Sequence, residues 1–160
     1  MLGPEKANEL FLIWFHGIIS QLTNQPVDIM IEKWIFRDHP DLRELQLASF
    51  RKQQAQAVYN LKAEVRNSAP PLLHDASNLM FYAYLRQLGI CVGENFLKSY
   101  NSSPYIDKGK ALSAILDGVK EDSMAGDVLK INMWAEFLGL DGWFDWIDFE
   151  KIPQGYEDAM

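Results

Sequence analysis

The sequence contains three histidines and one cysteine that could do nucleophilic or metal chemistry, and none of them falls in a motif. His16, His39 and His74 are not spaced as metal-binding pairs, and Cys91 has no second cysteine with which to share a metal or a disulfide. The chain contains no H-E-x-x-H helix, EF-hand loop, phosphate-binding glycine loop or G-x-S-x-G turn. The sequence therefore indicates no cofactor, and we expect a protein that is not an enzyme.

One weaker pattern involves His16 and two acidic residues that follow it. On the next predicted helix, Asp28 and Glu32 stand where a zincin metallopeptidase has a third, acidic metal ligand. The segment resembles a zincin that has lost its chemistry, because Gly17 and Ser20 replace the catalytic glutamate and the second histidine. The resemblance implies a degenerate metallopeptidase-like helical domain.

A helical enzyme with a site near His16 and Glu32 is a related alternative. Its site would be assembled from scattered residues, for example His16, Asp28, Glu32 and His74. The pattern also has a purely structural interpretation, in which His16 is a partly buried residue of a core helix and the two acids lie on solvated turns. The sequence leaves these alternatives open.

The acidic and aromatic residues near the C-terminus form the strongest candidate binding site. Large rings alternate with carboxylates in this segment: Asp141, Trp143, Phe144, Asp145, Trp146, Asp148, Phe149 and Glu150. Aromatic rings anchor many protein interfaces, and carboxylates around them favour a basic partner. We expect these residues to bind another protein with a basic or apolar surface.

The alternative is that the same rings fold back and close the core. In a helix, Trp143, Trp146 and Ile147 would share one face, while Asp141, Asp145 and Asp148 would face water.

The net charge is concentrated in the same part of the chain. Residues 107–160 contain 12 acids and 5 bases, which accounts for the net charge of −7, whereas residues 1–106 contain 10 of each. With a pI near 4.9, the chain lacks the positive field that nucleic-acid binding needs. We expect no nucleic-acid partner.

Apolar residues recur at helical spacing along the chain, and no alternating strand pattern occurs. The sequence predicts an all-α fold, with six or seven helices in a single globular domain over residues 1–160 and an acidic, aromatic-rich C-terminal segment at 107–160. The helices are expected at about residues 4–22, 27–37, 41–66, 75–88, 108–119 and 123–138. Residues 95–100 are expected to form a short turn, and residues 142–151 a short helix or an irregular lid.

Particular residues indicate how these helices begin, end and pack. The segment Leu10–Phe15 is apolar on nearly all sides, so we expect it to be the centre of the core. A turn is predicted at Thr23–Pro26, because proline suits the first turn of a following helix. Asp41 and Glu44 resemble a capping box that starts the third helix. Cys91 is expected to be a small core residue.

The composition limits where the protein works and with what. The longest apolar stretch, Leu10–Ile19, is too short to span a bilayer, and charged Glu5, Lys6 and Glu9 disagree with a signal peptide. We therefore expect a cytoplasmic protein with no membrane partner. These features favour a regulatory protein-binding module, such as an inhibitor, an immunity or antitoxin-like neutraliser, or an adaptor subunit. A structural subunit of a larger assembly is a further alternative.

Overall fold

The computed structural model describes residues 4–119 and 123–151, and α-helices make up most of this part of the chain. The α-helices are α1 (Pro4–Asp38), α2 (Arg43–Asn60), α3 (Ala63–Ser68), α4 (Pro71–Val92), α5 (Ile106–Gly118) and α6 (Met124–Leu138). The 3₁₀ turns are η1 (Pro40–Leu42), η2 (Lys98–Tyr100), η3 (Asp141–Trp143) and η4 (Phe149–Lys151). No strand occurs within the described ranges, so the prediction of an all-α fold with six or seven helices is confirmed.

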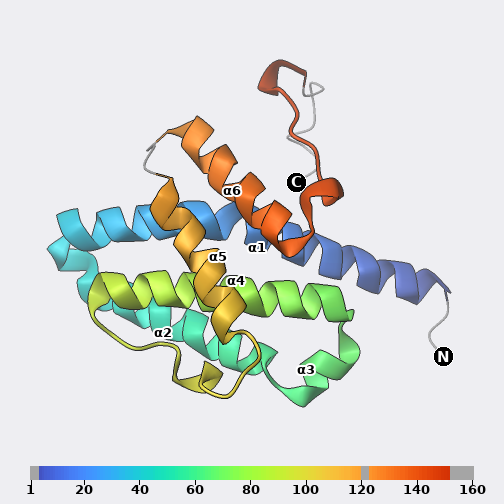
Figure 1. Cartoon of the computed structure of the whole chain (residues 1–160), viewed down its shortest axis with the longest axis horizontal. Coiled ribbons are helices and arrows are strands. Elements are labelled where there is room, and N and C mark those ends of the chain that lie inside the picture. Colours follow the sequence, from blue (N-terminus) through green and yellow to red (C-terminus); the bar gives the residue numbers. More distant parts are fainter. Residues whose placement is uncertain (1–3, 120–122, 152–160) are drawn as a thin grey trace.

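Helix α4 lies at the centre of the fold. It starts at Pro71, a residue suited to the first turn, and ends before Gly93, whose φ of 74° is a left-handed conformation that favours glycine. Buried residues occur on nearly all its sides, which is typical of a helix surrounded by others. It packs against α1, α2 and α5, and α5 crosses it in Figure 1.

Helix α1 is one continuous helix, so the turn predicted at Thr23–Pro26 is wrong. Pro26 has no backbone N–H to donate to the carbonyl one turn earlier, which costs about 3 kcal/mol inside a helix. Packing offsets this cost, because Leu22 and Ile29 on either side of the proline are completely buried. Tertiary burial has therefore overridden a reliable local signal.

The first turns of α1 do not lie in the core, contrary to the expectation for Leu10–Phe15. Residues 10–13 are all apolar and between 42% and 68% exposed. The reason is length: α1 has 35 residues and extends about 52 Å, whereas the 22 residues of α4 extend about 33 Å. In Figure 1 the N-terminal end of α1 projects beyond the other helices.

The region after α1 also departs from the sequence prediction in detail. Asp41 lies in η1, and α2 begins after Leu42 without a side-chain cap, so the predicted capping box is wrong. The long third helix is interrupted at Leu61 and Lys62, which separate α2 from α3. Cys91 is half-buried near the end of α4 rather than in the core.

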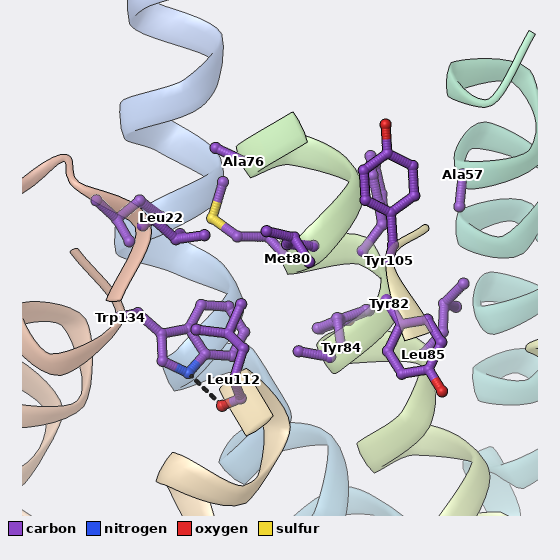
Figure 2. Packing of buried hydrophobic residues seen from close by; sticks show 14 of the residues in the cluster. Leu22, Ala57, Ala76, Met80, Tyr82, Tyr84, Leu85, Tyr105, Leu112 and Trp134 are labelled. Carbon is purple, nitrogen blue, oxygen red and sulfur yellow. Dashed lines mark hydrogen bonds between the residues drawn. The ribbon is translucent and has the colours of Figure 1, made fainter. Parts of the chain in front are cut away.

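The core joins α1, α4, α5 and α6 through large side chains. Trp134 of α6 is completely buried and its indole N–H donates to the carbonyl of Leu112 in α5 at 3.1 Å (Figure 2). Leu22 of α1 and Met80 of α4 belong to the same cluster. This packing fixes α6, which carries the candidate site at its C-terminal end. Among the described helices, none is long and apolar enough to cross a membrane.

Candidate functional site

The acidic aromatic segment starts from a fixed point at the end of α6. Gly139 takes a φ of 69°, and the N–H of Leu140 donates to the carbonyl of Ala135 at 2.8 Å, which ends the helix in a tight turn. Leu140 is fully buried and therefore anchors the following residues. We call residues 141–151 the tail; residues 120–122 and 152–160 of the acidic segment lie outside the described residues.

The first aromatic ring of the tail packs against the projecting part of α1. Trp143 stacks on Phe15 with ring centroids 6.0 Å apart and planes at 15°. Phe15 in turn stacks on Phe11 at 6.1 Å. A continuous row of three rings therefore joins the tail to α1, and no local sequence pattern indicates that these segments meet.

The next rings lie across α6. Phe144 meets Trp146 edge to face at 5.7 Å, and the indole N–H of Trp146 donates to the side-chain oxygen of Asn132 at 2.8 Å. Trp143 and Phe144 are half-buried against the core, whereas Trp146 and Ile147 are 51% and 68% exposed. The tail is thus anchored by its first rings and exposes its later ones.

We use the name docking surface for the exposed apolar residues of α1 and the tail together with the rings between them. Its members are Leu10, Phe11, Leu12, Ile13, Phe15, Trp143, Phe144, Trp146 and Ile147. In Figure 1 the tail starts next to the N-terminal half of α1 and then rises away from that helix. The surface therefore combines residues that are more than 120 positions apart in the sequence.

Carboxylates surround the rings of the tail. Glu136, Asp141 and Asp145 line a groove of about 370 Å³ together with Phe144 and Trp146. None of these three acids forms an ion pair with another described residue. The ion pair found in the described part of the tail joins Lys151 to Asp148 instead. The groove therefore presents a local negative field that nearby lysines or arginines do not neutralise.

The structure brings five of the predicted tail residues together: Asp141, Trp143, Phe144, Asp145 and Trp146. Asp148 and Glu150 lie further along, both exposed, and Phe149 begins η4. Residues 144–148 have no helical conformation, so the helical faces expected in the alternative for the tail are wrong. Trp143 and Phe144 do pack against the core, as that alternative expects, whereas Trp146 and Ile147 do not close it.

Sequence reasoning missed four residues of this site. They are Phe11 and Phe15 of α1, and Asn132 and Glu136 of α6. The available signal was the apolar run at residues 10–15, which the sequence analysis assigned to the core.

The zincin-like residues are not brought together. His16, Asp28 and Glu32 all lie on α1, so twelve residues of continuous helix separate His16 from Asp28 by about 18 Å. Glu32 instead accepts a hydrogen bond from the side-chain amide of Gln46 in α2. Within the ranges that the structure describes, no group of three or more histidine, cysteine or acidic side chains is arranged to hold a metal.

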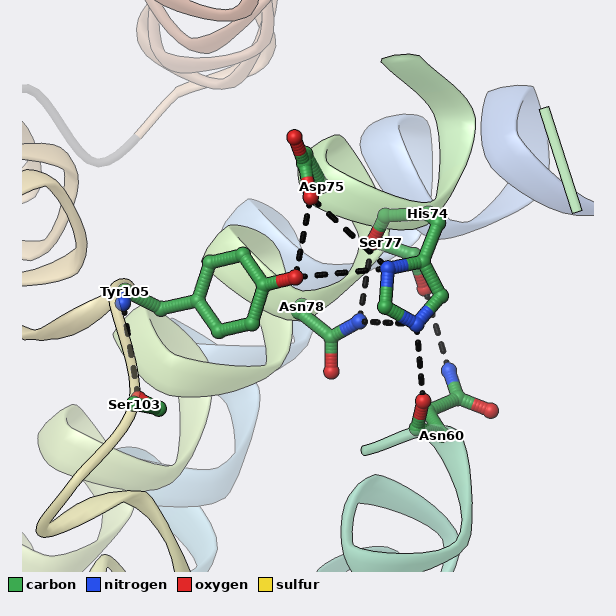
Figure 3. A network of polar contacts seen from close by, with 7 residues as sticks. All are labelled: Asn60, His74, Asp75, Ser77, Asn78, Ser103 and Tyr105. Carbon is green, nitrogen blue, oxygen red and sulfur yellow. Dashed lines mark hydrogen bonds and ion pairs between the residues drawn. The ribbon is translucent and has the colours of Figure 1, made fainter. Parts of the chain in front are cut away.

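His74 forms a buried polar network at the start of α4, shown in Figure 3. Its Nε2 lies 2.9 Å from the carbonyl of Asn60 in α2, and its Nδ1 lies 3.3 Å from the hydroxyl of Tyr105. That hydroxyl donates to Asp75 at 2.9 Å. Burial and this hydrogen bond raise the pKa of Tyr105 to about 12, so it remains a donor at neutral pH. The network ties α2, α4 and the segment before α5.

The surroundings of His74 and Cys91 do not favour reactivity, because both side chains are at least partly buried. His74 is only 4% exposed, and its contacts within the network do not include His16, Asp28 or Glu32. Burial raises the pKa of the Cys91 thiol, which lowers the fraction of nucleophilic thiolate.

Comparisons of the chain with protein-family models, curated proteins and solved structures find no match.

Proposed function

We propose that this protein acts by binding another protein through the docking surface, and that the partner offers apolar side chains together with lysines or arginines. The observation that carries the proposal is the joint exposure of apolar residues on α1 and in the tail, beside unpaired carboxylates. The proposal includes the classes expected from the sequence: an inhibitor, an immunity or antitoxin-like neutraliser, or an adaptor subunit.

The apolar part of the surface supports contact with a partner. Single exposed apolar residues are ordinary, but contiguous ones are uncommon on monomeric proteins and often mark interaction sites. Here four consecutive apolar residues are exposed around the projecting part of α1, and Phe11 among them belongs to the stacked row of rings. Burying them against a partner would remove a large apolar area from water.

The charged part of the surface supports the choice of partner. Glu136, Asp141 and Asp145 make the rim negative, which accelerates association with a basic protein and disfavours acidic ones. The same charge repels phosphate, so the proposal excludes nucleic acid as the partner. We also propose a cytoplasmic location, which we infer from the sequence alone.

The rings of the tail differ in how they are held and exposed, which supports different roles in binding. Trp143 and Phe144 are held by α1 and the core, so they restrict the tail before a partner arrives. Trp146 is oriented by Asn132 but remains half exposed, which suits an anchor that enters a pocket of the partner. A preorganised anchor loses little conformational freedom on binding.

The experiment compares two tryptophans of equal exposure. Trp146→Ala is tested against Trp34→Ala, because Trp34 is 49% exposed but lies about 28 Å further along α1 than Phe15, which contacts the tail. Partners captured from the native host by the wild type are identified, and their affinities for the purified variants are measured. We expect Trp146→Ala to weaken binding by about thirtyfold, a typical loss for a hot-spot residue, and Trp34→Ala to leave it unchanged.

A charge-matched pair tests the rim. Asp141→Asn with Asp145→Asn removes two charges from the groove, while Asp41→Asn with Glu44→Gln removes two exposed charges elsewhere. We expect slower association and weaker salt dependence for the first pair alone. Equal binding by all folded variants would contradict the proposal.

A further inference from the structure

Gly17 lies inside α1 at a position where neither the backbone conformation nor a neighbouring atom requires glycine. Glycine inside a helix is destabilising relative to alanine, because it loses more backbone freedom on folding. At Gly109 of α5 a side chain would collide with the ring of Tyr82, so glycine is required there. At Gly17 an added Cβ would meet nothing within 4 Å.

Gly17 lines a groove between α1, α2 and α4. The groove has a volume of about 300 Å³. Ile13 and Trp14 of α1 form one wall, and Leu73 and Phe81 of α4 form another. A larger side chain at position 17 would occupy this space, so the glycine keeps the groove open. A local departure from helix preference of this kind is expected where a site has a function.

Three of the four polar side chains that line the groove, those of Gln21, Asn60 and Ser77, are hydrogen-bonded to one another, and Gln56 is the fourth. The hydroxyl of Ser77 donates to Gln21 at 2.7 Å and accepts from the amide of Asn60 at 3.2 Å. The amide of Gln21 donates to the backbone carbonyl of Ser77 at 3.1 Å. These bonds hold the three helices together and leave the apolar walls as the main surface for a ligand.

The lining also determines the charge of a ligand. None of the described residues that line the groove is ionisable. A charged group placed there would lose hydration without gaining an opposite charge, which is strongly unfavourable. The ligand must therefore be neutral and largely apolar.

The volume and the aromatic walls determine its size and shape. An apolar cavity of about 150 Å³ takes up one benzene ring, so this groove has room for two fused rings. Trp14 and Phe81 can meet such rings edge to face or by stacking.

We propose that this groove is a binding site for a neutral bicyclic aromatic molecule of about the size of indole. The site lies on the side of α1 away from the stacked rings of the docking surface, because Gly17 and Phe15 point about 200° apart around α1 and Phe15 faces Trp143. The two sites share Ile13. Gly17 is the residue that makes the site accessible, and the groove-lining rings supply the affinity.

The test uses the full chain and three related probes. Indole is the neutral probe, indole-3-acetate is its anionic analogue and tryptamine is its cationic analogue. Binding is followed by two-dimensional NMR, with the indole N–H of Trp14 as the reporter in the groove. We expect saturable shifts that are centred on Trp14 and Gly17 with indole, and weaker binding of both charged analogues.

Two leucine substitutions on α1 provide the matched comparison. Gly17→Leu fills the groove, whereas Asn24→Leu adds the same side chain at an exposed position outside the lining. We expect Gly17→Leu to weaken indole binding by at least about tenfold and Asn24→Leu to leave it unchanged. Far-UV circular dichroism confirms that both variants are folded.

Three results would overturn the proposal. The first is indole binding that does not saturate or that shifts residues elsewhere, and the second is equal affinity of the wild type and Gly17→Leu. In the third, indole does not bind and Gly17→Leu instead abolishes capture of a protein partner. The groove would then receive an apolar side chain of that partner, and the docking surface would extend to it.

Discussion

The N-terminal part and the middle of α1 both carry apolar side chains but have opposite surroundings. From Ile18 to Ile29 the helix buries its apolar face against α4 and α6, whereas Leu10 to Ile13 lie exposed beyond the other helices. Phe11, Ile18 and Leu22 fall on the same side of the helix, so one apolar stripe runs from the core into solvent. The difference shows that an apolar stripe marks a surface that requires a partner, without saying whether that partner is in the same chain.

The largest expected effect comes from shortening a leucine in the middle of this helix and comparing it with the same change in its N-terminal part. Leu22→Ala leaves a cavity among fully buried residues and should lower the free energy of unfolding by about 2–5 kcal/mol. Leu12→Ala removes an exposed side chain and should change it by less than about 0.5 kcal/mol. Urea denaturation of both variants measures the contrast.

An equal loss of stability in both variants would show that the first turns of α1 are covered in the free protein. That result would remove the exposed apolar residues on which the proposed function rests.

Two ion pairs extend the comparison to charges. Lys130 and Asp127 of α6 lie 3.0 Å apart with the lysine fully buried, whereas Lys151 and Asp148 of the tail are both more than two-thirds exposed. Asp127→Ala leaves a buried ammonium without its carboxylate and should cost roughly 2–3 kcal/mol, reduced because Asp127 is partly exposed. Asp148→Ala should cost less than about 0.5 kcal/mol.

Thermal denaturation at low and high salt measures both changes. The double variant Asp127→Ala with Lys130→Met is the informative companion, because replacing a whole buried ion pair by apolar side chains is often nearly neutral. A large loss of stability in the double variant would mean that Lys130 makes favourable contacts beyond the pair with Asp127.

The same contrast explains how much of the fold followed from the sequence. Helical spacing located α4, α5 and α6 because their apolar residues meet neighbours along the whole helix, so local pattern and tertiary packing agree. At Pro26 they disagree, and burial of Leu22 and Ile29 decided the outcome. The position of the core was misjudged because hydropathy at Leu10–Phe15 carries no information on how long the neighbouring helices are.

The candidate site was predictable only in part for the same reason. The composition of the tail indicated Trp143 and Trp146, because rings and acids occur there in one short segment. The contact between Trp143 and Phe15 depends on the path of the chain through four other helices, and no local pattern encodes it. Gly17 was first interpreted as a missing catalytic residue, whereas its position beside the groove depends on α2 and α4.

The Tyr105 network offers a smaller effect that depends on pH. Tyr105→Phe removes the hydrogen bond to Asp75 and should lower stability by about 1–2 kcal/mol at neutral pH. Burial and Asp75 raise the pKa of Tyr105 to about 12, above the value of about 10 in an unfolded chain. The stabilisation is therefore complete below pH ~10 and is lost as the pH rises towards ~12.

Denaturation across this alkaline range should show a shallower fall for Tyr105→Phe than for the wild type. The exposed Tyr59→Phe serves as the control and should follow the wild type. Part of the fall will persist in Tyr105→Phe, because burial also raises the pKa values of Tyr84 and Tyr100. If the free energy of unfolding falls equally with pH in all three proteins, the Tyr105 network does not contribute to the loss of stability at alkaline pH.

The smallest expected effect is a gain, and it compares two glycines within helices. Gly17→Ala adds a methyl group in open space and should stabilise the protein by about 0.5–1 kcal/mol through helix preference. Gly109→Ala should destabilise it by about 1–3 kcal/mol, because the methyl group would press on Tyr82. Both are measured by urea denaturation. If Gly17→Ala is stabilising while Gly17→Leu loses indole binding, the wild-type glycine lowers stability in return for an open groove. A destabilising Gly17→Ala would show that the glycine has a structural role, and its presence in α1 would then no longer indicate a ligand site in the groove.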